Sequence, residues 1–257
     1  MNTTLITGAS SGIGAAFAQK LAALGRNVFL VARSEDKLIT LCNELGRMSG
    51  SRAQYFAIDL TEHDAPARLF EETRKRGLEI DMLINNAGVG SMGYFSGLDP
   101  GREVEIVELN MRSLVELTQR FLVPMRERKQ GTIINVASTA AFQPVPFMAT
   151  YAASKAFVLS FSDALWEENR PFGVHVMALC PGVTETNFFA AAKMDRPPVR
   201  GSQTPEQVVE TALRGLKRKQ SSIISGWTNK LVAFAVRLFP RSIVLRLTGK
   251  VLRQRFG

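Results

Sequence analysis

The chain has 257 residues, of which 46% are hydrophobic and 21% charged, and this length and composition fit one α/β domain with a large core. The longest apolar run, Leu231 to Val236, is too short to cross a bilayer. A strand-like segment begins almost at Met1, so no secretory leader is expected. We therefore expect a cytoplasmic protein, with peripheral membrane association left open by its basic C-terminus.

Charge is spread unevenly along the chain, whose net charge is +9. Residues 193–257 carry fourteen Lys or Arg and three Asp or Glu, which gives +11, whereas residues 1–192 carry eighteen and twenty, which gives −2. No carboxylate side chain follows Glu210. Residues 1–192 are thus close to neutral, whereas the C-terminal segment is strongly basic.

Strand-like and helix-like segments alternate along the chain. The expected strands are Thr3–Thr7, Asn27–Ala32, Gln54–Ile58, Met82–Asn85, Thr132–Val136, Val174–Leu179 and Ser222–Ser225. The expected helices are Ala15–Leu24, Glu35–Leu45, Pro66–Arg76, Glu103–Arg128, Ala152–Asn169 and Pro205–Lys219. This order predicts an α/β fold with a single doubly wound Rossmann domain around a central parallel sheet over residues 1–226, plus a C-terminal helical extension over residues 227–257.

A glycine-rich loop joins the first expected strand to the first expected helix. It reads Thr7-Gly8-Ala9-Ser10-Ser11-Gly12-Ile13-Gly14, with glycines in the order G-x-x-x-G-x-G. Glycines allow the backbone to approach a pyrophosphate, and the helix N-terminus offers free N–H groups and the positive end of a dipole. In this strand–turn–helix context, the loop predicts a dinucleotide-binding site.

A tyrosine and a lysine lie one helical turn apart in Tyr151-Ala-Ala-Ser-Lys155. Residues at i and i+4 share a helix face, so the phenol and the ammonium can point at one small site. A nearby cation favours the charged form of an acid, so we expect Lys155 to lower the pKa of Tyr151. Taken alone, the pair could also be a chance meeting on a helix surface.

From Thr3 to Gly226 the chain resembles the short-chain dehydrogenase/reductase family. The resemblance rests on motifs that occur together in this order: Thr7–Gly14, Asp59-Leu60, Asn85-Asn86-Ala87-Gly88, Asn110, Ser138, Tyr151-x-x-x-Lys155 and Pro181-Gly182. The chain departs from many family members only after Gly226, where it continues.

The resemblance implies four catalytic roles. Tyr151 exchanges a proton with the substrate oxygen, and Lys155 lowers the tyrosine pKa and binds the nicotinamide ribose. Ser138 fixes the same oxygen by a hydrogen bond, and Asn110 helps to hold a water on the proton path to Lys155. Taken singly, Ser138 could be a turn residue after a strand, and Asn110 could hydrogen-bond locally within a helix.

The expected cofactor is NADP(H). Arg33 follows the second strand, where an acidic residue would bind the ribose hydroxyls of NAD and a basic one the 2′-phosphate of NADP. The open alternative is a solvated arginine. The other expected cofactor contacts are the loop residues Gly8, Ser10, Ser11, Gly12, Ile13 and Gly14, together with Ser34, Asp59, Leu60, Asn86, Ala87, Gly88, Tyr151, Lys155, Pro181, Gly182, Thr184 and Thr186.

Apolar residues flank these motifs and indicate a fairly apolar, lipid-like or steroid-like carbonyl substrate. They are Val89, Met92, Tyr94 and Phe95, the segment Phe142 to Met148, and Phe188, Phe189 and Met194. The equally open alternative is that these loops simply pack on one another. The segment Asp195 to Gly201, with two prolines, is expected to form a mobile lid.

Few other chemical groups are available for a metal or a disulfide. The two cysteines, Cys42 and Cys180, have no paired spacing and are expected to be reduced thiols, and His63 and His175 are far apart in sequence. No metal site is therefore expected.

The basic tail from Trp227 to Phe256 contains two apolar stretches separated by Pro240. In the second stretch, apolar residues lie on one helical face and Arg246, Lys250 and Arg253 on another. Such a helix can lie on an anionic membrane, or it can pack on its own domain or on a partner subunit. Of these, the sequence favours packing or oligomerisation. No nucleic-acid motif is present, and a homodimer or homotetramer is expected.

The sequence therefore predicts an NADPH-dependent enzyme that reduces a ketone or aldehyde to an alcohol. Two alternatives stay open at this point. One is an NAD-linked alcohol dehydrogenase, which Arg33 argues against. The other is a catalytically idle dinucleotide-sensing or scaffold protein, which would have no need to keep Ser138, Tyr151 and Lys155 together.

Overall fold

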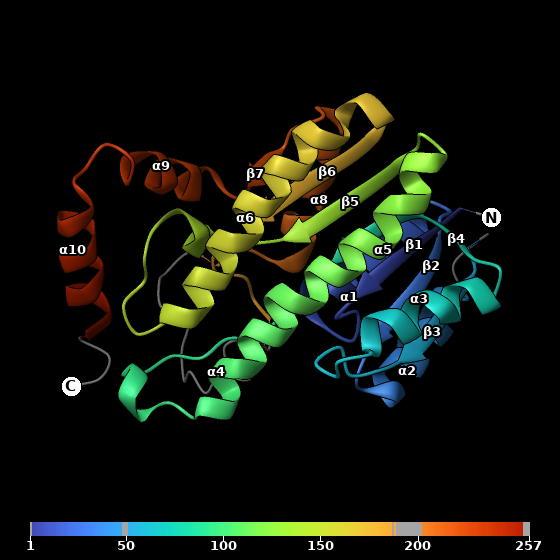
Figure 1. The fold of residues 1–257 in the computed structure, drawn as a ribbon, viewed down its shortest axis with the longest axis horizontal. Helices are drawn as coiled ribbons and strands as arrows, with labels where there is room; N and C mark the ends of the chain where they lie inside the picture. The colour runs from blue at the N-terminus through green and yellow to red at the C-terminus, as the bar shows by residue number, and fades with distance from the viewer. Residues whose placement is uncertain (1, 48–50, 187, 189–201, 254–257) are drawn as a thin grey trace.

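The computed structural model describes residues 2–47, 51–186, 188 and 202–253. At its centre lies a seven-stranded sheet in the order β3-β2-β1-β4-β5-β6-β7, in which all neighbouring strands are parallel (Figure 1). The strands are β1 (Asn2–Thr7), β2 (Asn27–Ala32), β3 (Ala53–Ala57), β4 (Glu79–Asn85), β5 (Gly131–Val136), β6 (Val174–Cys180) and β7 (Ser222–Ile224). The predicted single Rossmann-like domain with a parallel sheet is confirmed.

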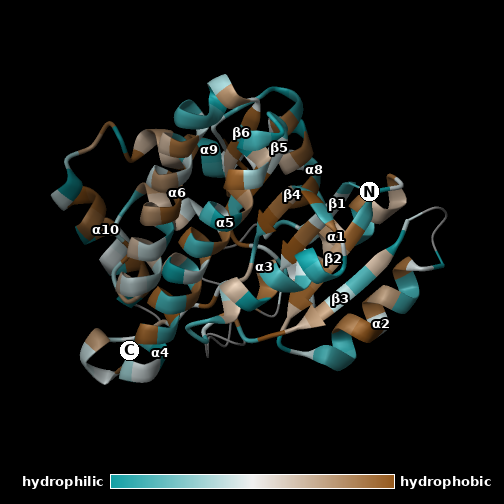
Figure 2. Ribbon diagram, turned by 45° about the vertical axis from the view of Figure 1, so that its right-hand side comes forward, coloured by the Kyte–Doolittle hydropathy of each residue, from teal (hydrophilic) through white to brown (hydrophobic). Residues whose placement is uncertain are grey.

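Helices cover both faces of the sheet (Figure 2), which explains why the central strands β1, β4 and β5 are buried over most of their length. One core lies between the sheet and the helices α1 (Gly12–Ala23), α2 (Glu35–Leu45) and α8 (Pro205–Lys217). The second lies on the opposite face, under α3 (Ala65–Lys75), α4 (Pro100–Val107), α5 (Leu114–Glu127) and α6 (Ala149–Asn169). Along β1, Ile6 enters the first core and Leu5 the second, as the two-residue period of a strand requires.

The direction in which strands are added reverses between β1 and β4. From β1 the chain builds β2 and β3 toward one edge of the sheet, and it then returns to build β4 to β7 toward the other. In such folds, ligands bind at the carboxyl edge of the sheet, beside the point where the strand order reverses. The glycine-rich loop and the loop of Asn86 leave β1 and β4.

Three predicted boundaries were wrong in an informative way. The single helix predicted over Glu103–Arg128 is α4, then the π-helical segment η2 (Glu108–Ser113), then α5. Strand β4 begins at Glu79 rather than at Met82, because its first residues pair with β1. Helix α6 begins at Ala149 rather than at Ala152, so Tyr151 already lies in its first turn.

The C-terminal segment forms two helices, α9 (Trp227–Ala235) and α10 (Arg241–Arg253), which lie together at one end of the molecule (Figure 1). Helix α9 contacts β7 and the short 3-10 helix η3 (Thr139–Phe142). No helix among the described residues is long and apolar enough to span a membrane. That residues 227–257 form a unit distinct from residues 1–226 stays a prediction.

Candidate active site

The glycine-rich loop after β1 is locked to the loop that follows β4. The Asn86 side-chain amide donates hydrogen bonds to the carbonyl oxygens of Thr7 and Gly8, at 3.0 and 3.2 Å. In return, the Thr7 hydroxyl accepts from the backbone N–H groups of Asn86 and Ala87, both at 3.0 Å. Gly8 has a φ of +64°, and a Cβ on it would lie 2.9 Å from the Cα of Ala87. Only glycine fits at this contact without strain.

The N-terminus of α1 opens at the same edge of the sheet. Ser11 is its N-cap residue, but no side chain among the described residues caps the helix, and its first turn carries no acidic residue. Ser11 is exposed, Ser10 and Ile13 are half-buried, and Gly14 is buried. The first-turn N–H groups and the helix dipole therefore favour an anion at this position.

The segment after β6 spans the site from the 3-10 helix η3 to the glycine-rich loop. The carbonyl oxygen of Pro181 accepts from the N–H of Thr139 at 2.8 Å, which ties the segment to η3. The hydroxyl of Thr184 donates to the carbonyl of Gly182 at 3.1 Å and shapes the turn. At its other end, Thr186 packs on the glycine-rich loop, since its Cγ2 lies 2.8 Å from where a Cβ on residue 12 would be.

Ser138, Tyr151 and Lys155 come together at the ends of β5 and the start of α6. Ser138 follows β5 and caps η3, where its hydroxyl accepts from the N–H of Ala140 at 3.1 Å. The side chains of Tyr151 and Lys155 are both buried, with 9% and 5% exposure. The Lys155 ammonium donates to the carbonyl of Val136 at 2.8 Å and lies 5.9 Å from the centre of the Tyr151 ring.

Burial dominates the ionisation of both groups. Burial raises the pKa of Tyr151 to about 12, against a smaller lowering by its hydrogen bond with Ser138. Burial also lowers the pKa of Lys155 to about 8, against a smaller opposing effect of the neighbouring Cys180. The pKa of Tyr151 is therefore raised overall, because the loss of hydration dominates, and the expected lowering by Lys155 stays a prediction.

Asn110 lies on the π-helical segment η2 and uses its whole side-chain amide on protein partners. Its carbonyl oxygen accepts from the N–H of Val89 at 3.0 Å, and its amide nitrogen donates to the carbonyl of Val89 at 2.9 Å and to the hydroxyl of Ser154 at 3.1 Å. A Cβ on Gly88 would lie 3.1 Å from the Asn110 oxygen and 3.4 Å from the Lys155 nitrogen. Asn110 thus fixes the β4 loop beside Lys155.

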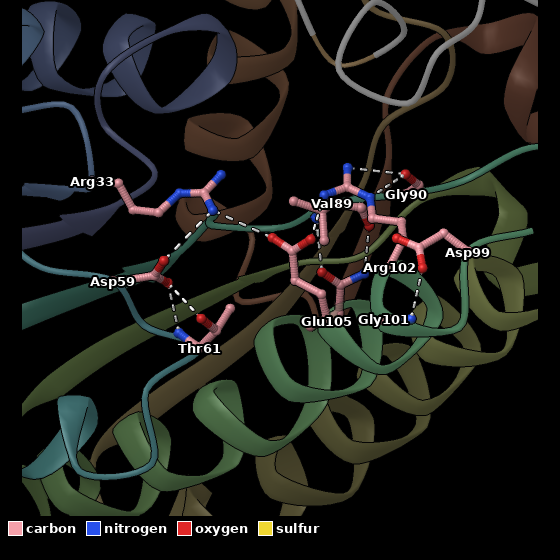
Figure 3. A network of polar contacts seen from close by, with 10 residues as sticks. Arg33, Asp59, Thr61, Val89, Gly90, Asp99, Gly101, Arg102 and Glu105 are labelled. Atoms are coloured by element: carbon pink, nitrogen blue, oxygen red, sulfur yellow. Dashed lines mark hydrogen bonds and ion pairs between the residues drawn. The ribbon is translucent and has the colours of Figure 1, made fainter.

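The ends of β2 and β3 form a separate part of the site, shown in Figure 3. The Arg33 guanidinium, on a side chain that is 57% exposed, lies 3.6 Å from an Asp59 carboxylate oxygen and 3.4 Å from one of Glu105. Asp59 also accepts from the backbone N–H and the hydroxyl of Thr61, at 2.9 and 2.7 Å. Burial raises the pKa of Asp59, but the Thr61 bonds and Arg33 outweigh it, so the pKa is lowered overall.

Ser34 and Leu60 adjoin this pair. Ser34 is the exposed N-cap residue of α2, and Leu60 is 4% exposed in the core beneath the strand ends. The structure therefore divides the predicted residues into two groups. Those around Arg33 and Asp59 lie at the ends of β2 and β3, and those around Tyr151 lie at the ends of β4, β5 and β6.

Two charged residues that the sequence analysis did not single out link these groups. Arg102 forms an ion pair with Glu105 at 2.6 Å and donates to the carbonyl of Gly90 at 3.1 and 3.2 Å (Figure 3). A Cβ on Gly90 would lie 3.2 Å from a ring carbon of Tyr151. The i,i+3 spacing of Arg102 and Glu105 was visible in the sequence, but it indicates only a helix-surface pair.

An apolar cluster surrounds the Tyr151 ring, and Phe188 packs on that ring with the two centroids 5.3 Å apart. Its other members are Met92, Ala140, Val145 and Met148. The prediction that all the flanking apolar residues line one substrate pocket is too broad, because Tyr94 and Phe95 are 57% and 64% exposed. Tyr94 instead packs edge-on against the ring of Phe147.

Several expectations concern residues outside the described ranges. Phe189, Met194 and the expected lid from Asp195 to Gly201 all belong to this part of the chain. Within the described residues, no group of three His, Cys, Asp or Glu could hold a metal ion. Cys180 is buried and Cys42 half-buried, and both are free thiols.

Comparison with known proteins agrees with this geometry. Residues 2–197 match the family model described as short chain dehydrogenase. The chain is 32% identical to the ketoacyl reductase HetN of Nostoc sp., over 86% of this chain and 77% of that protein. It is also 32% identical to the very-long-chain 3-oxoacyl-CoA reductase of Macaca fascicularis, over 87% of this chain and 73% of that one.

A solved short-chain dehydrogenase from Sphingobium yanoikuyae, in complex with NADPH, superimposes with a TM-score of 0.83 at 32% identity and covers 88% of this chain and 89% of its own. The chain belongs to the short-chain dehydrogenase family. It is an oxidoreductase that acts on the C=O and CH–OH groups of small molecules and binds a nicotinamide dinucleotide.

Proposed function

We propose that this enzyme uses NADPH to reduce the carbonyl group of a fairly apolar substrate to an alcohol, with Tyr151 as the proton donor. The observation that carries this proposal is the juxtaposition of Ser138, Tyr151 and Lys155. The three side chains meet at the carboxyl edge of the sheet, where the uncapped N-terminus of α1 also opens.

The residues of this edge fit a dinucleotide. The glycine-rich loop leads into the uncapped N-terminus of α1, whose free N–H groups and positive dipole end suit a pyrophosphate. Arg33 would meet the 2′-phosphate, and Asp59 would face the adenine end. Pro181, Gly182, Thr184 and Thr186 would line the nicotinamide end. When bound, NADPH supplies the hydride.

The ionisation of Tyr151 suits a proton donor. With a pKa raised by burial to about 12, the phenol holds its proton at neutral pH. An alcohol oxygen that gains negative charge during reduction is more basic than a phenolate, so it can take this proton. Ser138 hydrogen-bonds the phenol and would donate to the same substrate oxygen, which fixes the geometry of the transfer.

Lys155 and Asn110 would act as positioning groups around this donor. Lys155 is held by the Val136 carbonyl next to the Tyr151 ring, where its positive charge would stabilise the phenolate left after proton transfer. Asn110 holds the backbone of Val89 on both its N–H and C=O. The family role of Asn110 in holding a water stays a prediction.

Two observations support an apolar substrate. The cluster of Met92, Val145, Met148 and Phe188 lines the Tyr151 ring. The two curated relatives compared above are named as reductases of ketoacyl and very-long-chain 3-oxoacyl-CoA compounds. A carbonyl on a long acyl chain is therefore the substrate class that we favour, and a homodimer or homotetramer stays the predicted assembly.

The test is NADPH oxidation by the purified protein with ketones, aldehydes and 3-oxoacyl thioesters of increasing apolar size, with Tyr151→Phe alongside. Turnover should fall at least about a hundredfold in this variant, as for the loss of a general acid, while NADPH affinity stays within about twofold. Tyr55→Phe is the matched control, because it removes a phenol hydroxyl at the exposed β3 edge. Near-normal turnover by Tyr151→Phe would contradict the mechanism.

A further inference from the structure

The exposed apolar surface of this protein is concentrated on its two C-terminal helices. Of the seventeen large hydrophobic side chains that are exposed among the described residues, nine lie between Trp227 and Val251. On and just after α9, the residues Trp227, Leu231, Phe234 and Leu238 recur at the spacing of one helix face, and each is at least 57% exposed. Such a contiguous apolar surface marks an interaction site.

Helix α10 combines an apolar stripe with a basic one on its exposed side. Its buried face, which includes Val244 and Leu252, already packs on the protein. Ile243, Leu247 and Val251 follow one another at i, i+4 and i+8 and are 45%, 61% and 59% exposed. The exposed residues Arg246, Lys250 and Arg253 form the neighbouring stripe. This arrangement suits a helix that lies in the plane of a lipid interface.

Within the described part of the chain, the positive charges of this surface are not paired with carboxylates. No carboxylate side chain follows Glu210 in the sequence. Among the described residues, the ion pairs involve none of the lysines and arginines of α9, α10 or their connection. Among these described cationic side chains, Arg237 alone has a partner, the ring of Phe142, at 5.7 Å from its centroid.

We propose that the exposed face of α9 and α10 docks this enzyme on an anionic lipid surface. The apolar side chains would enter the boundary between head groups and acyl chains, and the basic stripe would meet the head-group charges. A second copy of the chain is a poorer occupant. A two-fold interface would bring the same basic stripe from each copy together, with no carboxylate to offset it.

Docking would place the substrate side of the active site at the lipid surface. Gly249 of α10 lies against Pro146, whose ring carbons would be 3.6 and 3.9 Å from a Cβ on that glycine. Pro146 adjoins Val145 and is two residues from Met148, which both pack with Tyr151. The helices that would touch lipid therefore touch the loop that lines the reacting group. This consequence depends on the proposed function, whereas the docking itself does not.

Vesicle flotation of the full chain tests the proposal. We expect the protein to float with vesicles of phosphatidylcholine and phosphatidylglycerol at a ratio of about 7:3, to float poorly with phosphatidylcholine alone, and to be released by high salt. In a Trp166→Phe background, which leaves Trp227 as the single tryptophan of the two in the chain, binding should shift the emission to the blue.

Two triple variants should each weaken binding. Arg246→Gln with Lys250→Gln and Arg253→Gln should lower affinity on the order of a hundredfold, since each charge near an anionic surface contributes roughly fivefold. Leu231→Gln with Phe234→Gln and Leu247→Gln should abolish both the flotation and the blue shift.

The controls carry changes of the same kind on exposed residues elsewhere, three for the charges and two for the apolar side chains. Arg47→Gln with Arg52→Gln and Lys75→Gln removes the same charge, and Leu24→Gln with Val104→Gln removes exposed apolar side chains. Both controls should float like wild type, and unfolding midpoints should show that every variant is folded.

Failure of the wild-type protein to float with either vesicle would overturn the proposal. If light scattering then shows an oligomer that the apolar triple variant breaks, the face is an interface between copies. Equal loss of vesicle binding in the α10 charge variant and in its charge control would also overturn the proposal. Binding would then depend on the net charge of the protein rather than on this face.

Discussion

Burial makes the charge of Lys155 unfavourable to the folded state. Its pKa is lowered from 10.5 to about 8, so between these pH values the unfolded chain binds more protons at this group than the folded one. Stability contributed by the group therefore rises as pH increases through this window, and it does not change below about pH 8, where both states are charged.

Replacement of the lysine isolates this effect. The free energy of unfolding of wild type, relative to Lys155→Met, should rise by about 3 kcal/mol between pH 8 and 10.5. Urea unfolding of both proteins across this range measures the difference. A difference that stays flat, or that falls with pH, would show that Lys155 keeps its charge in the folded protein.

Arg33 tests the choice of dinucleotide. Arg33→Ala should weaken NADPH binding about tenfold to a hundredfold, the worth of hydrogen bonds to a charged group, and leave NADH binding nearly unchanged. Glu105→Gln should tighten NADPH binding, because it removes a carboxylate that lies 3.4 Å from the guanidinium. Titration calorimetry with both nucleotides measures these changes.

A second arginine provides the control for Arg33. Arg68 also contacts two carboxylates, Glu62 and Asp64, on a side chain that is 49% exposed, and it lies on α3. Arg68→Ala should change the binding of neither nucleotide. Equal weakening of NADPH and NADH by Arg33→Ala would mean that Arg33 does not discriminate between them.

For single residues, the sequence predicted which side chains lie close together, but it did not predict how deeply they are buried. The spacing of Tyr151 and Lys155 predicted that their side chains lie close together, and in the structure the Lys155 nitrogen is 5.9 Å from the centre of the Tyr151 ring. The pKa of Tyr151 could not be predicted, because it depends on how deeply the side chain is buried. Phe188, which helps to bury it, is distant in the chain, and Met148 lies at the end of an irregular loop. The contact of Glu105 with Arg33 could not be predicted either, because it depends on how α4 packs near the end of β2.

Among the elements, the β1–α1 turn depends on Gly8. Gly8→Ala should destabilise the protein by about 2–4 kcal/mol, since it combines left-handed backbone strain with a contact of 2.9 Å against Ala87, and it should abolish dinucleotide binding. Chemical unfolding and nucleotide titration measure the two effects.

Gly25→Ala separates strain from contact. Gly25 also has a positive φ, of +77°, but a Cβ there would have nothing within 4 Å. Its substitution should cost about 1 kcal/mol and leave nucleotide binding intact. Equal losses in the two variants would mean that the packing of Gly8 on Ala87 contributes nothing.

Periodicity predicted most elements but not their irregularities. The bounds of α2 matched its predicted range from Glu35 to Leu45, where an amphipathic pattern follows an N-cap serine. The π-helical segment could not be predicted, because an apolar period does not reveal one extra residue in a turn. The Asn110 amide ties this segment to the backbone of Val89, in the loop after β4, and that contact is not visible in a periodic pattern.

For the whole molecule, alternation of strands and helices was enough to predict a parallel sheet with its site at the carboxyl edge. It could not show which surfaces stay exposed. The amphipathic pattern of α10 is equally compatible with packing and with exposure, and only the structure shows that Leu247 and Val251 remain open to solvent. Part of the uneven charge that was visible in the sequence, carried by Lys230, Arg237, Arg241, Arg246, Lys250 and Arg253, belongs to α9, α10 and their connection, which lie at one end of the molecule (Figure 1).

The π-helical turn at Glu108–Ser113 also works as an angular spacer. Each residue of an α-helix advances the direction of the side chains by about 100°. If this wide turn closed as a regular α-helix with all its residues kept, α4 would rotate relative to α5 by about that angle. Arg102 and Glu105 would then face away from Gly90 and Arg33, so the alignment of the two halves of the site depends on one helical turn staying wide.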